Sequence, residues 1–551
     1  LYGAWAREAQ VDHTLLTHGS KSIESTREVR TTHTENPAFL LTLNSDSFSE
    51  TCGEVIAGAL AWSGNFRLNF EVDEFDVLTV LAGANPNASE YRLRPGETFT
   101  TPEMIYTHSF CGAGGASRNL HDWARNYGIY HGHEVVPTLL NSWEGAYFKF
   151  DAKVLKQMID DAASMGLEMF VLDDGWFGKR NSDTSSLGDY TVNEKKLPGG
   201  LRGLGEKLNA MGLQFGLWFE PESVNPDSDL YRAHPDWALT DGFQPVLGRN
   251  QLLLDLTRPE VRDYIVENVS RILDSTGISY VKWDMNRHSV ALGAKAHDFV
   301  LGLYDVLRRI FAPRPDILLE GCSSGGNRFD LGMLCFSPQI WASDNTDPIE
   351  RLTIQNGISY LYPQSTMGAH VSAAPHAQTL RNTPLNTRGN VAFFQGQIAF
   401  YKRYREVFQF GTFRRTELGW QVSDGKVTLA GVFPRLVNAA PGYERLRVKG
   451  LKPETDYRVT SLAQAIRVGQ FGNLLKHVAP VNVNPNGALL RIADRHITLP
   501  GKPETLTASG AALAAGIMLS PLFRGTGYAP EQRTQGDFGS DVYLIEEIGG
   551  E

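Results

Sequence analysis

The chain of 551 residues has few cysteines, no long apolar run and no excess of positive charge. Its four cysteines form no CxxC pair, which argues against both a disulfide framework and a structural zinc site. No run of about 18 apolar residues occurs, so we expect no membrane span. The start of the chain lacks the basic residues and the apolar stretch of a signal peptide. These absences favour a cytoplasmic protein.

The net charge of −10 disfavours a polyanionic partner, so we expect no binding to nucleic acid. The sequence contains no P-loop, no GxGxxG motif after a strand and no repeat of fixed period. The glycine-rich stretch Gly112–Gly115 lacks the flanking strand and helix that a phosphate-binding loop needs.

The patterning changes twice along the chain. Alternating runs such as Phe66–Val72 predict antiparallel sheet in the first part. Short buried strands and helical stretches such as Ala152–Ala163 fill the middle, and strands return with Pro- and Gly-rich turns towards the end. We therefore predict a multidomain α/β protein, a (β/α)8 barrel flanked by N-terminal and C-terminal antiparallel β-sandwich domains. The predicted domains are a partial N-terminal sandwich over 1–130, the barrel over 131–415 and the C-terminal sandwich over 416–551.

Eight candidate strands fit the barrel. They are Thr138–Asn141, Glu168–Leu172, Phe215–Phe219, Ser279–Trp283, Ile317–Leu319, Gln339–Ala342, Thr366–Val371 and Val391–Phe394. Polar residues follow six of them, namely Glu144, Asp173, Asp174, Glu220, Glu222, Asp284, Cys322 and Asp344. Parallel strands place their carboxyl ends on one face, where barrel enzymes build their active sites. The sequence therefore predicts a pocket rich in carboxylates.

Asp284 and Asp344 are the candidate catalytic pair, since two carboxylates facing one pocket suggest cleavage of a glycosidic bond. Lys282 lies two residues before Asp284, on the same side of the strand, where its charge favours the ionised aspartate. Trp341 and the negative charge of Asp284 are expected to raise the pKa of Asp344. The pattern thus predicts a nucleophile and a proton donor.

Tryptophans and acids near the strand ends suit a sugar, because aromatic faces bind C–H surfaces and polar groups bind hydroxyls. Asp173 and Asp174 follow one strand directly. The sequence leaves three roles open for this pair: binding of sugar hydroxyls, binding of magnesium together with Glu220 and Glu222, or formation of a structural turn. Five tryptophans flank the strand ends, Trp143, Trp176, Trp218, Trp283 and Trp341, although such residues also cap barrel strands without touching substrate.

Seven long motifs in the middle of the chain resemble those of the family 36 glycoside hydrolases, the bacterial α-galactosidases. They are WEGAYF from Trp143, FVLDDGWFG from Phe170, GLWFEPE from Gly216, GRNQLLLDL from Gly248, YVKWDMNRH from Tyr280, LEGCSSGGNRFD from Leu319 and WASDNTD from Trp341. The similarity extends from Gly3–Glu8 to Gly536–Ser540 and so covers nearly the whole chain. The family's fold agrees with the barrel and sandwiches predicted above.

The resemblance implies that Asp284 is the nucleophile and Asp344 the acid/base of a retaining double displacement on terminal α-galactosides, with no cofactor and no metal. It also implies a substrate-binding set: Trp143, Asp173, Asp174, Trp218, Arg249, Lys282, Asn286, Cys322, Gly325 and Trp341. Cys322 and Gly325 match the positions beside the sugar's 2-hydroxyl, where small residues suit galactose. An α-galactosaminidase or α-N-acetylgalactosaminidase is the alternative within this chemistry.

Two alternatives belong to other classes. One is a magnesium-dependent lyase that uses Lys282 as its base, and the other is a barrel that binds galactosides without cleaving them. By comparison with the family, most of the N-terminal sandwich is absent, and the segment between His288 and His297 is short. Leu1 in place of a methionine agrees with a trimmed chain. A homo-tetramer is common among these enzymes. If the N-terminal part is truly lost, we do not expect this chain to form the tetramer.

Overall fold

The computed structural model describes residues 1–26, 30–43, 48–87, 90–240, 242–287, 292–369, 371, 391–436, 445–462, 465–467, 484, 487–500, 504–518 and 539–549. The chain divides into two compact units. The first comprises Leu1–Thr383 with Val391–Arg403, and the second Pro384–Asn390 with Tyr404–Glu551. None of the described helices is long and apolar enough to cross a membrane.

A parallel sheet of seven strands forms the centre of the first unit, in the order β17-β16-β15-β14-β11-β10-β9. Its strands are β9 (Leu139–Asn141), β10 (Met169–Leu172), β11 (Gln214–Phe219), β14 (Tyr280–Trp283), β15 (Leu318–Gly321), β16 (Gln339–Trp341) and β17 (Met367–Gly368). All four residues of β10 and of β14 are buried, as expected for strands covered on both faces. The register pairs Trp218 with Lys282 and Lys282 with Glu320, so neighbouring strands end at the same level.

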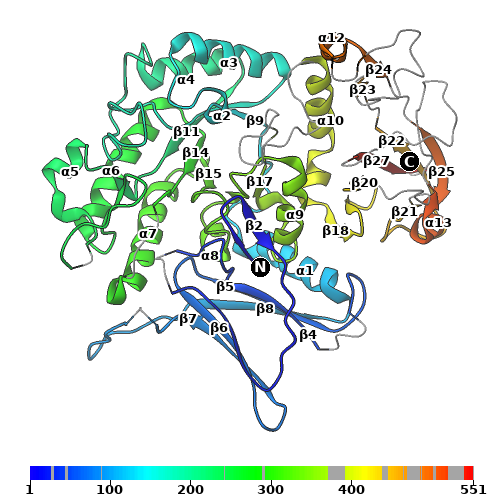
Figure 1. Cartoon of the computed structure of the whole chain (residues 1–551), viewed down its shortest axis with the longest axis horizontal. Coiled ribbons are helices and arrows are strands. Elements are labelled where there is room, and N and C mark those ends of the chain that lie inside the picture. The colour runs from blue at the N-terminus through cyan, green and yellow to red at the C-terminus, as the bar shows by residue number, and fades with distance from the viewer. Residues whose placement is uncertain are drawn as a thin grey trace. The chain divides into compact units, whose positions relative to one another are not determined.

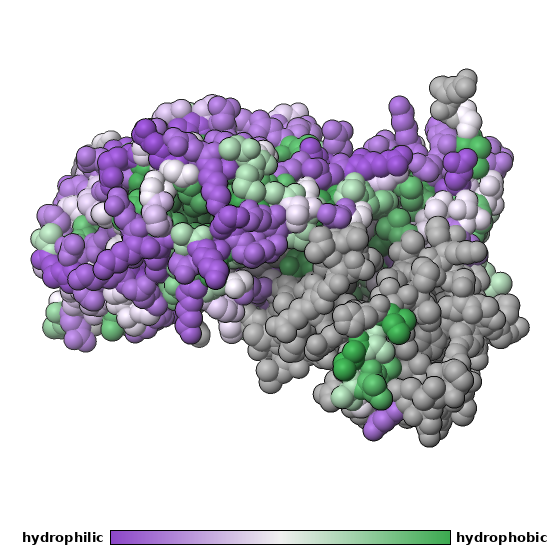
Figure 2. Space-filling view, turned by 90° about the horizontal axis from the view of Figure 1, so that it is seen from above, coloured by the Kyte–Doolittle hydropathy of each residue, from purple (hydrophilic) through white to green (hydrophobic). Residues whose placement is uncertain are grey.

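Amphipathic helices lie outside this sheet (Figure 1). They are α3 (Ala152–Met165), α4 (Gly200–Ala210), α6 (Pro259–Thr276), α7 (Ala296–Phe311) and α9 (Pro348–Ile358), with the shorter α2 (Trp143–Ala146), α5 (Asp229–Ala233) and α8 (Leu331–Leu334) between strands. In α3 the N-cap Asp151 accepts hydrogen bonds from two backbone N–H groups, and Gly166 ends the helix at a φ of 80°. Leu155 and Ile159 of α3 face the core. In the view from above, hydrophilic residues predominate among the coloured atoms in the left half of the picture (Figure 2).

The predicted eighth strand, Val391–Phe394, is wrong. These residues begin helix α10, which runs over Val391–Phe410. A short apolar run does not distinguish a buried strand from a helix, and here the helix continues from Gln395 to Phe410, about four turns beyond the run. The prediction for Thr366–Val371 is also too long, because only Met367–Gly368 pairs with β16 and His370 lies outside the described residues. Residues 288–291, at the start of the segment predicted to be short, lie outside them as well.

Two antiparallel sheets of three strands form the N-terminal part of the first unit, in the orders β3-β6-β7 and β4-β5-β8. The strands are β3 (Gly19–Glu24), β4 (Ala38–Thr42), β5 (Val55–Ala61), β6 (Phe66–Val72), β7 (Leu78–Ala84) and β8 (Glu103–Ser109). Phe39 of one sheet meets Phe70 of the other edge to face, with ring centroids 5.0 Å apart, inside a shared apolar cluster. A separate hairpin, β1 (Tyr2–Ala4) and β2 (Arg7–Gln10), precedes them.

The glycine-rich stretch Gly112–Gly115 does have a strand before it and a helix after it, contrary to the prediction. It follows β8 and opens helix α1 (Gly112–Trp123). A Cβ atom at Gly112 would lie 2.3 Å from the carbonyl oxygen of Ser49, and one at Gly115 would lie 2.2 Å from Ser109 Oγ. These glycines therefore permit close backbone packing.

The second unit contains a six-stranded antiparallel sheet in the order β18-β19-β20-β27-β22-β25. Its strands are β18 (Thr412–Thr416), β19 (Gly419–Ser423), β20 (Val427–Val432), β22 (Asp456–Ser461), β25 (Thr505–Ser509) and β27 (Asp541–Glu547). Two further strand pairs join β21 (Arg445–Leu446) to β26 (Ile517–Met518) and β23 (Ala465–Arg467) to β24 (Thr498–Pro500). The described part of this unit also contains α12 (Ala488–His496), α13 (Gly510–Ala515) and the end of α10. Val459 and Ile545 contribute to its apolar core.

Candidate active site

Asp284 lies directly after β14 and is buried, with 7% of its surface exposed. Its Oδ2 atom accepts hydrogen bonds from Trp218 Nε1 at 3.2 Å and Asn286 Nδ2 at 2.7 Å. Its Oδ1 atom accepts one from the backbone N–H of Met285 at 2.8 Å and a longer one from that of Ser324 at 3.4 Å. Four donors around one carboxylate stabilise the ionised form and fix its direction.

Electrostatics also favour the charged form of Asp284. Burial opposes ionisation, but the positive charge of Lys282, the hydrogen bond from Asn286 and the charge of Arg249 together hold the pKa of Asp284 below its usual range. The predicted effect of Lys282 on this aspartate is therefore confirmed. A carboxylate that stays ionised while buried is suited to act as a nucleophile.

Asp344 follows β16 and has the opposite electrostatic character. Burial raises its pKa, and the negative charge of Asp284 adds to this effect. The raised pKa of Asp344 agrees with the prediction, but the predicted effect of Trp341 is wrong. The indole N–H of Trp341 donates to Asp344 Oδ1 at 3.1 Å, which favours the charged form and lowers the pKa. A raised pKa is what a proton donor needs, so the two carboxylates differ in the sense that a nucleophile and an acid require.

The sequence analysis missed the second indole at Asp344. Trp5, from the turn between β1 and β2, donates from Nε1 to Asp344 Oδ2 at 2.8 Å, across 339 positions in the chain. Its side chain is half exposed, at 51%. The resemblance included Gly3–Glu8, but nothing in the local pattern indicated that this segment reaches the barrel.

Asp173 and Lys282 form a buried ion pair in which Lys282 Nζ lies 2.9 Å from Asp173 Oδ2. Asn141 Nδ2 donates to the same oxygen at 2.7 Å. Burial opposes the charge of Lys282, but the carboxylate of Asp173 raises the pKa of the ammonium well above its usual value. A lysine held positive in this way is a poor general base, which argues against the lyase alternative.

Asp174 points to a different partner. The guanidinium of Arg180 binds both of its carboxylate oxygens, with Nε–Oδ1 and Nη2–Oδ2 distances of 2.8 Å. Arg180 is almost fully buried, and its Nη1 atom also donates to Asn225 Oδ1 at 3.0 Å. Sequence reasoning missed Arg180, although it stands in the printed sequence six residues after Asp174. The bidentate pair fixes the direction of this carboxylate.

The five tryptophans near the strand ends do not share one role. Trp218 donates a hydrogen bond to Asp284, and Lys282 Nζ lies over the Trp341 ring at 5.9 Å. Trp143 is partly exposed on α2. Trp176 and Trp283 have no exposed surface and belong to the apolar core.

Strand geometry explains the position of Trp283. It alternates with Lys282 and Asp284 along one strand, so its side chain lies on the opposite face of the sheet. Its Nε1 atom donates to Glu222 Oε1 at 2.8 Å. Arg328 binds both oxygens of the same carboxylate. Glu222 is therefore engaged in a buried ion pair.

Asn286, Arg249 and Ser324 form a polar chain beside Asp284. Arg249 Nη1 donates to Asn286 Oδ1 at 2.6 Å and to Ser324 Oγ at 3.2 Å. Asn286 binds Glu220 through its backbone N–H at 2.5 Å and its side-chain amide at 3.1 Å. Burial, followed by the charge of Asp284, raises the pKa of Glu220 to about 7. Glu220 thus holds Asn286 in position.

Cys322 and Gly325 follow β15. The Cys322 thiol is buried, and its hydrogen bond also lowers the pKa of Asp284. Burial raises the pKa of the thiol itself well above its usual value. Gly325 has a φ of 84°, and a Cβ atom there would lie 2.6 Å from Glu8 Oε1. A larger residue at 325 would adopt a strained backbone conformation and would displace the carboxylate of Glu8.

All twelve predicted site residues lie at or next to the carboxyl ends of the barrel strands or in the loops that follow them. Hydrogen bonds and ion pairs join Asp173 to Lys282, and Asp284 to Trp218 and Asn286. No group of three or more His, Cys, Asp or Glu residues with the geometry of a metal site occurs in the described part of the chain.

Comparison with known proteins gives consistent matches. Residues 98–411 match the Melibiase family, and residues 1–94 match the glycosyl hydrolase family 36 N-terminal domain. The chain is 42% identical to α-galactosidase AgaA from Geobacillus stearothermophilus over 84% of its own length and 69% of that protein. It is 40% identical to α-galactosidase Mel36A from Lactobacillus acidophilus over 83% of its length and 68% of that protein. It spans about half, 52%, of a bifunctional α-galactosidase/sucrose kinase from Mediterraneibacter gnavus.

Solved structures agree with these sequence matches. The crystal structure of the glycoside hydrolase family 36 α-galactosidase AgaA superposes with a TM-score of 0.84 at 37% identity, covering 100% of this chain and 74% of that one. A variant of that enzyme in complex with raffinose gives the same score, identity and coverage. A variant in complex with stachyose superposes with a TM-score of 0.85 at 36% identity and the same coverage.

Proposed function

The chain belongs to glycoside hydrolase family 36, and on that premise we propose that it hydrolyses terminal α-galactosyl residues of oligosaccharides with retention of anomeric configuration. The observation that carries the proposal is the opposite shift of the two strand-end carboxylates, since the pKa of Asp284 is lowered and that of Asp344 is raised. We assign this activity to the barrel predicted over 131–415.

In the first step Asp284 attacks the anomeric carbon while Asp344 transfers its proton to the leaving oxygen. The glycosidic C–O bond breaks as the bond from Asp284 to the sugar forms. In the second step Asp344, now ionised, removes a proton from water, and that water displaces Asp284 and releases the sugar. Retention requires the two carboxyl groups to stand about 5–5.5 Å apart.

We assign the galactose hydroxyls to Asp173, Asp174, Lys282 and Arg249. Asp173 and Lys282 form a buried pair at 2.9 Å, so a hydroxyl that enters meets an acceptor and a donor already fixed in position. The Arg180 contact orients Asp174 in the same way. We propose that Asn286 also binds the sugar. We assign Trp143, Trp218 and Trp341 to the aromatic walls of the pocket.

Substrates of the raffinose and stachyose type suit the proposal, because related enzymes have been solved with these sugars. Cys322 is buried, and Gly325 lacks a side chain next to the carboxyl of Glu8. We place the 2-hydroxyl of galactose beside these two residues. Parallel assays on 4-nitrophenyl α-galactoside and its 2-amino and 2-acetamido counterparts distinguish galactose from the amino sugars.

The test is hydrolysis of 4-nitrophenyl α-galactoside by the parent and by Asp284→Asn in EDTA, with NMR identifying the first anomer released. We expect α-galactose from the parent and no turnover by the variant, with EDTA having no effect. Release of β-galactose first would contradict retention. Loss of activity in EDTA would point to metal chemistry, and binding without turnover by the parent would favour a sugar-binding protein.

A further inference from the structure

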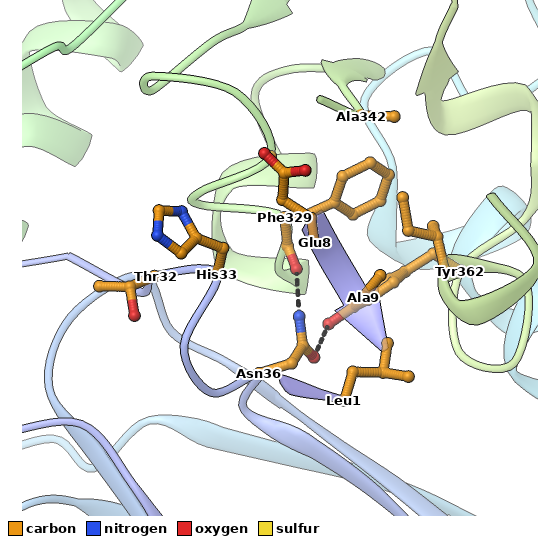
Figure 3. A pocket seen from close by; sticks show the side chains of 11 residues that line it. Leu1, Glu8, Ala9, Thr32, His33, Asn36, Phe329, Ala342 and Tyr362 are labelled. Carbon is orange, nitrogen blue, oxygen red and sulfur yellow. Dashed lines mark hydrogen bonds between the residues drawn. The ribbon is translucent and has the colours of Figure 1, made fainter. Parts of the chain in front are cut away.

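The N-terminal hairpin carries a buried carboxyl group that the mechanism above does not use. Glu8 on β2 is only 2% exposed. Its carboxylate points away from Asn36 in the pocket that it helps to line (Figure 3). Burial, with a smaller contribution from the charge of Asp344, raises the pKa of Glu8 to about 6. Burying a carboxyl group costs free energy unless hydrogen bonds compensate for the lost water, so the contacts of Glu8 indicate what this group does.

Glu8 lies between the two loops that carry the catalytic machinery. On one side are Gly325 and Gly326, where added Cβ atoms would lie 2.6 Å from Glu8 Oε1 and 3.4 Å from Glu8 Cγ. That loop also holds Ser324, whose backbone N–H points to the nucleophile. On the other side is Ser343, whose hydroxyl donates to Glu8 Oε2. Ser343 immediately precedes the acid/base.

The hairpin binds three consecutive residues of the loop after β16. Glu8 accepts the hydrogen bond from Ser343, Trp5 donates to Asp344, and the carbonyl oxygen of Ala6 accepts from Asn345 Nδ2 at 2.9 Å. The Ser343 hydroxyl in turn accepts from the backbone N–H of Asn345 at 3.0 Å. The carboxyl of Glu8 therefore determines the direction of a hydroxyl that closes this loop around the catalytic aspartate.

The close packing of β2 on the barrel makes this anchor firm. A Cβ atom at Gly357 of α9 would lie 1.8 Å from the carbonyl oxygen of Ala9, so only glycine permits this approach. Arg351 of α9 donates from Nη2 to the carbonyl oxygen of Ser343 at 2.6 Å and from Nε to that of Asn345 at 2.6 Å. The loop is thus held by α9 from one direction and by the hairpin from the other.

We propose that Glu8 is a positioning residue for the acid/base: through Ser343 it holds Asp344 where its proton reaches the leaving oxygen. The inference rests on the proposed function, because it takes Asp344 to be the proton donor. Glu8 does not touch the reacting atoms. Its loss is expected to weaken protonation of the leaving group and to leave attack by Asp284 intact.

Substrates with different leaving groups separate this role from a general loss of structure. A sugar leaving group, as in raffinose, needs the proton that Asp344 supplies, whereas a nitrophenolate departs with little help. Glu8→Ala should therefore lower kcat/KM for raffinose by about 10- to 100-fold, part of the roughly 10²- to 10⁴-fold that a general acid contributes. The loss on 2,4-dinitrophenyl α-galactoside should stay below about 3-fold.

Two further variants sharpen the test. Glu8→Gln keeps an oxygen that accepts from Ser343, so it should recover most of the raffinose activity. Glu24→Gln is the control, since Glu24 on β3 is a carboxyl in the same N-terminal part that accepts its hydrogen bond from Asn85 Nδ2 at 2.9 Å. If Glu8→Ala does not fold, Ser343→Ala removes the same hydrogen bond from the other side and should show the same selective loss.

Equal losses on both substrates, or no loss on raffinose, would overturn the inference and leave the proposed function standing. A folded parent that turns over neither substrate would refute the proposed function, and the role of Glu8 with it. Thermal unfolding of each variant shows that the comparison is made between folded proteins.

Discussion

Replacing Lys282 with methionine tests the electrostatic design of the pocket most directly. Lys282 Nζ lies 2.9 Å from Asp173 Oδ2, and the two residues are 8% and 3% exposed. Methionine fills similar space but has no charge, so the variant leaves Asp173 buried without its cation. Breaking a buried pair from one side typically costs about 3–5 kcal/mol, and we expect a loss of unfolding free energy in that range.

The same substitution should change catalysis in a defined direction. Lys282 favours the ionised form of Asp284, so its removal should raise the pKa of Asp284. The acidic limb of kcat/KM against pH, which in the proposed mechanism reports ionisation of Asp284 in the free enzyme, should therefore move to higher pH. The assay is hydrolysis of 4-nitrophenyl α-galactoside across the pH range.

A double-mutant cycle separates the ion pair from other effects. Lys282→Met with Asp173→Asn removes both charges and should recover part of the stability that the single variant loses. Lys156→Met is the control, because its pair with Asp160 on α3 is exposed and contributes about 0.3–0.5 kcal/mol. Additive losses in the cycle, or an acidic limb that stays in place in Lys282→Met, would refute this reasoning.

Three other substitutions test the groups around the carboxylates. Trp5→Phe removes a hydrogen bond that favours ionised Asp344, so its pKa should rise and the alkaline limb of kcat/KM should move to higher pH; an unchanged limb would count against the contact. Arg180→Met leaves Asp174 buried without its cation and should cost about 3–5 kcal/mol in denaturant unfolding, with a loss under about 1 kcal/mol as the contrary result. The pKa of Glu220 is raised to about 7, so the folded state binds the proton more tightly and the parent loses stability as pH rises from about 4.5 to 7. Glu220→Gln should show a smaller loss across this window, and an equal loss would assign the pH dependence to other groups.

Much of the fold could be predicted because strands and amphipathic helices are local patterns. Four predicted strands end at the same residues as the observed strands, namely Asn141, Leu172, Phe219 and Trp283, and their first residues differ by one position. The helical stretch predicted over Ala152–Ala163 also lies within α3, which buries Leu155, Ile159 and Ala162. Val391–Phe394 shows the limit, since four apolar residues suit a strand or a helix equally and the longer context decided for α10.

Side-chain partners were harder to predict than strand ends. The sequence placed Trp176 and Trp283 near the pocket, but both side chains are buried in the apolar core. Trp283 points to the opposite face of the sheet from Lys282. It expected Trp341 to raise the pKa of Asp344, whereas the indole N–H donates to the carboxylate and lowers it. Orientation of a side chain depends on neighbours that are distant in sequence, so residue type and position alone do not settle it.

Residue order alone predicted that Asp284 and Asp344 face the same end of the sheet, because each acid follows a strand and parallel strands present their carboxyl ends on one face. The contacts of Trp5 with Asp344 and of Glu8 with Ser343 became visible in the folded chain alone, since both come from a hairpin outside the barrel, more than 330 positions earlier in the chain. The physical reason is that a strand end is fixed by local backbone geometry. The approach of a separate hairpin depends instead on how two distant surfaces pack.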